Sequence, residues 1–203
     1  MSTRRATIVD AAARLIERRG YERTSVDDVI AASGLSGKSH FYHYFKSKEE
    51  LGYHVLEHQF DRFAERGLVM LREPMIDPAE RLDLFVDTLV ALQEQAGSGS
   101  ASPFGALAAE VAETHEGFRQ RLDLVFERWA RQLELLFWEL RPRLRAGAEP
   151  ARLARFVIAA LEGGMMMARV KRDASVMRGI GADLKQFIDN QLVTDARTAT
   201  AGE

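Results

Sequence analysis

The sequence contains no cysteine among its 203 residues. This excludes disulfides, zinc sites built from thiolates, and enzymes or redox sensors that depend on a cysteine. It also has no apolar run of the roughly 18 residues that a membrane-spanning helix requires. The N-terminal segment MSTRRATIVDAAARL lacks the long apolar stretch of a signal peptide. We therefore expect a cytoplasmic protein that makes no membrane contact.

A strong net charge is absent as well, because the formal charge is only −2. Its distribution is nevertheless uneven. Residues 1–48 carry nine Lys and Arg against five acidic residues, whereas the remaining 155 residues carry 19 basic and 25 acidic ones. A basic N-terminal segment followed by an acidic remainder indicates that the N-terminal part binds a polyanion.

No segment shows the period-two alternation of a β-strand, and nearly every segment shows helical periodicity. The expected fold class is all-α, with about nine helices. The hydrophobic content of 46% is enough for a sizeable core. Helix start signals precede several of the apolar stripes; they lie at Thr24 or Ser25, Ser47, Asp77 and Pro150. The helix that begins at Lys48 is expected to continue to about Arg72.

The segment from Ala32 to Ser39 has the spacing A-x-x-x-x-G-K-S, which is close to a phosphate-binding P-loop. A P-loop needs a buried strand before its glycines and a second strand that ends in Asp. The preceding residues SVDDVIAAS contain Asp27 and Asp28, which suit the first turn of a helix and not a buried strand. The nucleotide-binding interpretation is therefore disfavoured.

A helix, a turn with Gly34 and a short helix over about residues 37–44 form the plan of a helix-turn-helix. The second helix of this motif enters the DNA major groove. Its polar side chains can contact phosphates or base edges; they are Lys38, Ser39, His40, Tyr42 and His43. Phe41 and Phe45 are four residues apart and are expected to anchor the helix to the core.

The stretches IVDAAARLIERRGYERTSVDDVIAASGLS and FYHYFKSKEEL, within residues 8–51, resemble the N-terminal domain of the TetR (tetracycline-repressor) family. The resemblance implies a DNA-binding domain over residues 1–50 and an effector-binding and dimerisation domain over residues 51–203. It also implies a homodimeric repressor that a small molecule releases from a palindromic DNA operator. The stretch ALEGGMMMARVKRD resembles part of the family's dimerising last two helices, expected here at about residues 150–192.

The resemblance implies phosphate contacts for Thr24, Ser25, Tyr42 and Lys48. Seven residues lie between Gly34 and Tyr42, one more than in the family pattern. The additional residue lies near Gly37, so the way in which Lys38 and Ser39 face the bases stays open.

Two further groups are candidates for chemistry. Five side chains can line an effector pocket or simply fill the core; they are Phe85, Phe104, Phe126, Trp129 and Met165. His54-Val-Leu-Glu57-His58 matches the H-x-x-E-H pattern of some zinc peptidases, which makes a helical metal-dependent hydrolase the alternative function. No third metal ligand is identifiable, so we expect a regulator that is not an enzyme and has no metal or other cofactor.

Overall fold

The computed structural model describes residues 3–97 and 102–193. Within these ranges it contains nine α-helices, two 3-10 turns and no strand, which confirms the predicted all-α class. The α-helices are α1 (Thr3–Arg19), α2 (Val26–Ser33), α3 (Lys38–Tyr44), α4 (Lys48–Arg66), α5 (Pro78–Ala96), α6 (Pro103–Val111), α7 (Glu116–Glu139), α8 (Pro150–Lys171) and α9 (Ser175–Asp189). None of these helices is long and apolar enough to cross a membrane.

The helices begin where side chains satisfy their free backbone N–H groups. Ser25 caps α2 in a capping box with Asp28, and the Ser47 hydroxyl accepts a hydrogen bond of 3.0 Å from the Glu50 amide at the start of α4. Asp77 caps α5 through the Ala79 amide at 2.9 Å, with Pro78 as the first helical residue. The predicted start signals at Ser25, Ser47 and Asp77 are therefore confirmed.

The predicted end of α4 near Arg72 is wrong, because the helix ends at Arg66. Gly67 closes it by donating its amide to the Phe63 carbonyl at 2.8 Å, and a 3-10 helix (η1, Leu68–Arg72) follows. The change of winding turns Leu68 and Leu71 into the core, where they are buried. Burial of these two leucines stabilises the bend.

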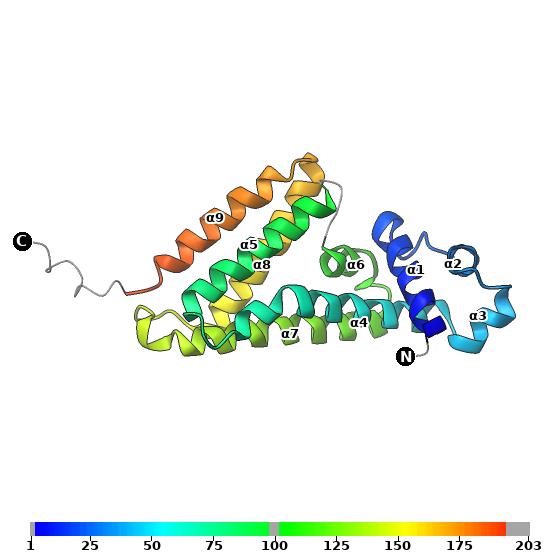
Figure 1. Ribbon diagram of the computed structural model, residues 1–203, viewed down its shortest axis with the longest axis horizontal. Coiled ribbons are helices and arrows are strands. Elements are labelled where there is room, and N and C mark those ends of the chain that lie inside the picture. The colour runs from blue at the N-terminus through cyan, green and yellow to red at the C-terminus, as the bar shows by residue number, and fades with distance from the viewer. Residues whose placement is uncertain (1–2, 98–101, 194–203) are drawn as a thin grey trace, which may run out of the picture.

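The helices are arranged in two groups (Figure 1). The head, formed by α1–α3, lies at one end of an elongated molecule, and the body, formed by α4–α9, makes up the rest. In the body, α7 packs against α8, and α9 packs against both α8 and α5. Helix α4 leads from the head into the body and lies beside α7.

Two hydrophobic clusters correspond to these groups. The cluster of the head includes Phe41 and Phe45, and that of the body includes Trp129 and most of the other large aromatic residues. Helix α4 contributes Leu51 to the first cluster and Phe60 to the second, so one helix is built into both cores. The division of the chain into residues 1–50 and 51–203 stays a prediction.

Candidate nucleic-acid interface and adjoining groove

The turn between α2 and α3 depends on two glycines. Gly34 ends α2 in the left-handed conformation, with φ 65° and ψ 33°, and Gly37 precedes α3 with φ 157° and ψ −175°. Residues other than glycine rarely adopt these φ values. The residue before the turn ends a helix and not a strand, so the segment is a helix-turn-helix and lacks the strand that a P-loop requires.

Helix α3 has a buried face and an exposed face. Phe41 and Phe45 are buried in the core of the head, as the sequence predicts. Tyr42 is 52% exposed, although it lies next to Phe41 in the sequence. The exposed side chains of α3 follow helical spacing; they are Lys38, Ser39, Tyr42 and His43. The head thus presents a polar helical face on which nothing else in the described chain packs closely.

Two of the predicted contact residues have internal partners. The Lys38 ammonium lies 3.2 Å from the Asp27 carboxylate, and both side chains are well exposed. Exposed ion pairs are weak, so a phosphate can replace Asp27 as the partner. His40 is only partly exposed, its Nδ1 lies 3.3 Å from the Ser36 hydroxyl, and its ring lies 5.6 Å from that of Tyr44. His40 thus contacts the turn before α3 through Ser36.

Three residues near the start of α2 and α4 differ in their access to a phosphate. Thr24 is 2% exposed, and its hydroxyl donates to the Gly20 carbonyl at 2.7 Å, so it presents no surface to a ligand. Ser25 is exposed at the N-terminus of α2. Lys48 donates to the Glu22 carbonyl at 3.3 Å and lies 4.3 Å from the centre of the Tyr21 ring. In the structure, Lys48 of α4 thus contacts the segment that follows α1.

The two histidines of the H-x-x-E-H pattern face α1. His54 Nε2 lies 2.7 Å from the Arg5 guanidinium, and His58 Nε2 lies 2.8 Å from the Asp10 carboxylate, an ion-pair contact and not a well-directed hydrogen bond. Among residues 3–97 and 102–193, no three side chains come together as metal ligands. The hydrolase alternative is not supported, because both histidines join α4 to α1.

The five predicted pocket residues lie in or against the core of the body. Phe85, Phe104 and Trp129 are buried, whereas Phe126 and Met165 are partly buried against them. The Trp129 ring lies 4.8 Å from that of Phe63 and stacks on Phe126 at 6.4 Å. All five residues thus belong to or pack against the core of the body, and their role in ligand binding stays a prediction.

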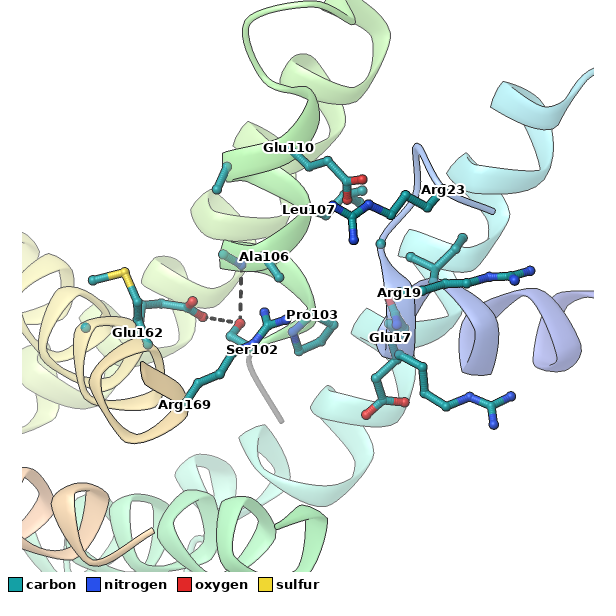
Figure 2. A pocket seen from close by; sticks show the side chains of 18 residues that line it. Glu17, Arg19, Arg23, Ser102, Pro103, Ala106, Leu107, Glu110, Glu162 and Arg169 are labelled. Atoms are coloured by element: carbon teal, nitrogen blue, oxygen red, sulfur yellow. Dashed lines mark hydrogen bonds between the residues drawn. The ribbon is translucent and has the colours of Figure 1, made fainter. Parts of the chain in front are cut away.

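A groove of about 700 Å³ lies elsewhere, between α1 of the head and α6 and α8 of the body (Figure 2). None of the five predicted pocket residues lines it. Its ionisable side chains are Glu17, Arg18, Arg19, Arg23, Glu110, Glu162 and Arg169. The sequence patterns above do not predict this groove. Glu162 is a single acidic residue within the apolar run of α8, a pattern that could have indicated it.

Glu162 and Ser102 form the most buried polar pair of the groove. The Ser102 hydroxyl donates to Glu162 Oε1 at 2.6 Å and accepts from the amides of Phe104 and Gly105, which begin α6. Burial raises the pKa of Glu162 to about 7, although hydrogen bonds from the Ser102 hydroxyl and the Gly105 amide favour the ionised form. Near neutral pH, this carboxyl is thus present in both its protonated and its ionised form.

Glu110 connects α6 to the head. Its carboxylate accepts hydrogen bonds of 2.8 Å from the amides of both Tyr21 and Glu22, just after α1. Tyr21 is buried against Phe118 of α7, with ring centres 4.7 Å apart. A Cβ on Gly52 of α4 would lie 2.5 Å from Phe118 Cζ, so the junction is tightly packed. The segment after α1 is therefore in direct contact with both α6 and α7.

Comparison with known proteins identifies the family. Residues 8–52 match the model of bacterial regulatory proteins of the tetR family. Residues 78–183, more than half of the chain, match a model described as "Transcriptional regulator LmrA/YxaF-like, C-terminal domain". The chain belongs to the TetR family. It is thus a DNA-binding transcriptional regulator and not an enzyme, as the sequence predicts.

Relatives cover nearly the whole TetR-family chain. The HTH-type transcriptional repressor DhaR of Mycobacterium sp. (strain GP1) is 25% identical over 83% of this chain and 84% of its own length. The HTH-type transcriptional regulator LmrA of Bacillus subtilis is 25% identical over 91% of this chain and 96% of its own length. A TetR regulator from Chloroflexus aurantiacus has a similar structure, with a TM-score of 0.82 and 26% identity over 93% of this chain and 96% of its own.

Proposed function

We propose that this TetR-family regulator is a repressor that binds a palindromic operator and leaves it when a small molecule binds the body. The observation that carries this proposal is the exposed polar face of α3, which is supported from behind by Phe41 and Phe45. A rigid helix with this pattern can enter the major groove. The relative DhaR is named a repressor, which supports repression and not activation as the role of this chain.

The proposed DNA contacts follow the exposure of the side chains. Lys38, Ser39, Tyr42 and His43 face the bases and phosphates, and Ser25 at the start of α2 contacts the backbone together with free amides of the helix. Lys48 reaches a phosphate only if it leaves the Glu22 carbonyl, and Thr24 supports the turn from inside. His40 contributes to DNA binding indirectly, through its contact with Ser36 in the turn before α3.

Operator binding is tested by fluorescence anisotropy with the DNA upstream of the gene, at several salt concentrations. We expect a sequence-preferring complex whose affinity falls steeply as the salt concentration rises, because Lys and Arg displace counterions from the phosphates. A matched DNA of scrambled sequence is the control. Equal affinity for both DNAs, together with no selected site in a random library, would contradict the proposed function.

We further propose that the dimer forms through α8 and α9. Phe156 of α8 and Phe187 of α9 remain 44% and 38% exposed while their rings lie 4.5 Å apart. More exposed apolar side chains follow on the same face of α8; they are Met167 and Val170. A second copy of the chain covers this surface best, because a two-fold axis brings the same patch from both subunits together.

The variant Phe156→Glu with Phe187→Glu is expected to be a folded monomer by light scattering and to lose about a hundredfold or more in operator affinity. The two substitutions place buried charges in the proposed interface, and a monomer contacts only one half-site. Leu124→Glu on α7 is the control, since Leu124 is 61% exposed and lies outside α8 and α9. A doubly substituted chain that stays dimeric would place the interface elsewhere.

Release by a ligand requires the ligand to bind the DNA-incompetent state more tightly than the DNA-bound state. The junction offers a physical connection between the two sites, because Glu110 of α6 and Phe118 of α7 hold the segment after α1. A ligand that moves α6 or α7 changes the position of the head, and with it the separation of the two α3 helices in the dimer.

A further inference from the structure

The groove between α1, α6 and α8 contains a carboxylate without a cationic partner. No basic side chain in the described parts of the chain forms an ion pair or a hydrogen bond with Glu162. Arg19, on the opposite wall, pairs with Asp28 at 2.8 Å and points away from Glu162 in Figure 2. The hydrogen-bond donors to Glu162 are the Ser102 hydroxyl and the Gly105 amide. A partly buried carboxylate that no cation neutralises is costly to keep, and such groups commonly serve binding or catalysis.

Both oxygens of this carboxylate lie against the start of α6. Ser102 occupies Oε1, and Oε2 lies against Gly105 so closely that a Cβ at that position would overlap it. The absence of a side chain at Gly105 thus lets the carboxylate settle against the first turn of α6. Glu162 therefore has a fixed position, and an ionised carboxylate can accept more hydrogen bonds than those from Ser102 and Gly105.

Next to Glu162 the groove offers apolar surface. Ile16 of α1, Leu107 of α6 and Met166 of α8 come from its three walls, and small residues of α6 line the space between them. A volume of about 700 Å³ accommodates a drug-sized molecule. Sites of this kind bind the body of a ligand by apolar contact and fix its orientation through a few polar groups.

We propose that this groove is the effector site and that Glu162 binds the ammonium group of an organic amine with an apolar body. The effector role rests on the proposed function, whereas the binding chemistry does not. The ammonium supplies the missing cation and donates to the carboxylate, which makes a charge-assisted hydrogen bond. The raised pKa of Glu162 agrees with this arrangement, because it reflects burial that no internal cation offsets.

The position of the groove explains how the amine acts on DNA binding. One wall is α1 of the head, and another is α6, whose Glu110 holds the amides of Tyr21 and Glu22. An amine in the groove contacts both parts at once. The orientation of the head relative to the body therefore depends on whether the groove is filled.

The test compares three probes of nearly equal size, phenylbutylamine, phenylbutanol and phenylbutyrate, by titration calorimetry on the full-length protein at neutral pH. We expect the amine to bind at least about tenfold more tightly than the alcohol and the carboxylate. Glu162→Gln is expected to remove this preference. Glu17→Gln is the matched control, because Glu17 lines the same groove from α1 but is exposed.

Absence of amine binding, equal binding of the three probes, or an equal loss in Glu17→Gln would overturn the proposed site. Operator anisotropy with the same samples separates the two proposals. An operator complex together with no amine preference contradicts the groove and leaves the repressor function standing. Amine binding that requires Glu162, with no operator complex under any condition, contradicts the repressor function and leaves the ligand chemistry standing.

Discussion

Replacing Lys38 and Tyr42 together with alanine is expected to lower operator affinity by about a hundred- to thousandfold. Each substitution removes one contact from each head, so a dimer loses four contacts of roughly 1 kcal/mol each. The fold is expected to stay intact, because Tyr42 is 52% exposed and the Lys38 ion pair with Asp27 is an exposed one. Fluorescence anisotropy against the selected operator measures the loss.

The salt dependence distinguishes a lost contact from a general loss of affinity. Because Lys38 is the charged member of the pair, the slope of log affinity against log salt is expected to fall by about two, one phosphate contact per head. Arg131→Ala is the control, since Arg131 is exposed on α7, outside the head and outside α8 and α9. An unchanged affinity and slope in the Lys38 and Tyr42 variant would show that α3 does not face the DNA.

Local sequence signals predicted the head well for a physical reason. Capping residues, turn glycines and apolar spacing act over a few residues, so the sequence alone shows them. Ser25, Gly34 and Gly37 each stand where a cap or a positive φ is needed, and Phe41 and Phe45 face the core. The resemblance to the TetR family rests on this same short segment.

Other parts depend on contacts between distant residues and were not predictable in this way. The groove brings together Ile16, Ser102 and Glu162, which are far apart in the chain. Thr24 carries a hydroxyl of the right kind for phosphate, but it is buried and donates to the Gly20 carbonyl four residues earlier, which its residue type alone does not show. The five apolar residues that were candidates for a pocket satisfy the core equally well, and composition alone does not distinguish the two roles.

Glu162→Gln is expected to stabilise the ligand-free protein at pH 8 by up to about 3 kcal/mol relative to the natural chain. Burial raises the pKa of Glu162 from 4.5 to about 7, so the ionised form is disfavoured in the folded state. Glutamine cannot ionise, and its amide oxygen still accepts the hydrogen bond from Ser102. Urea unfolding of both chains between pH 5 and pH 8 measures the difference.

The direction of the pH dependence follows from proton binding. Below pH 4.5, Glu162 is protonated in the folded and the unfolded state, and it adds no pH-dependent cost. Between pH 4.5 and about 7, the unfolded chain releases the proton while the folded chain keeps it, so the natural protein loses stability as the pH rises. Above pH 7 both states are ionised and the full cost is present. The advantage of Glu162→Gln therefore grows with pH and then levels off.

Glu17→Gln is the control for this measurement as well, because an exposed side chain is expected to change stability by no more than about 0.5 kcal/mol. An advantage of Glu162→Gln that is the same at pH 5 and pH 8 would contradict the burial of an unpaired carboxyl. Saturating phenylbutylamine adds a second expectation, since an ammonium partner stabilises the ionised form. The amine should stabilise the natural chain most at pH 8 and reduce the advantage of the variant there.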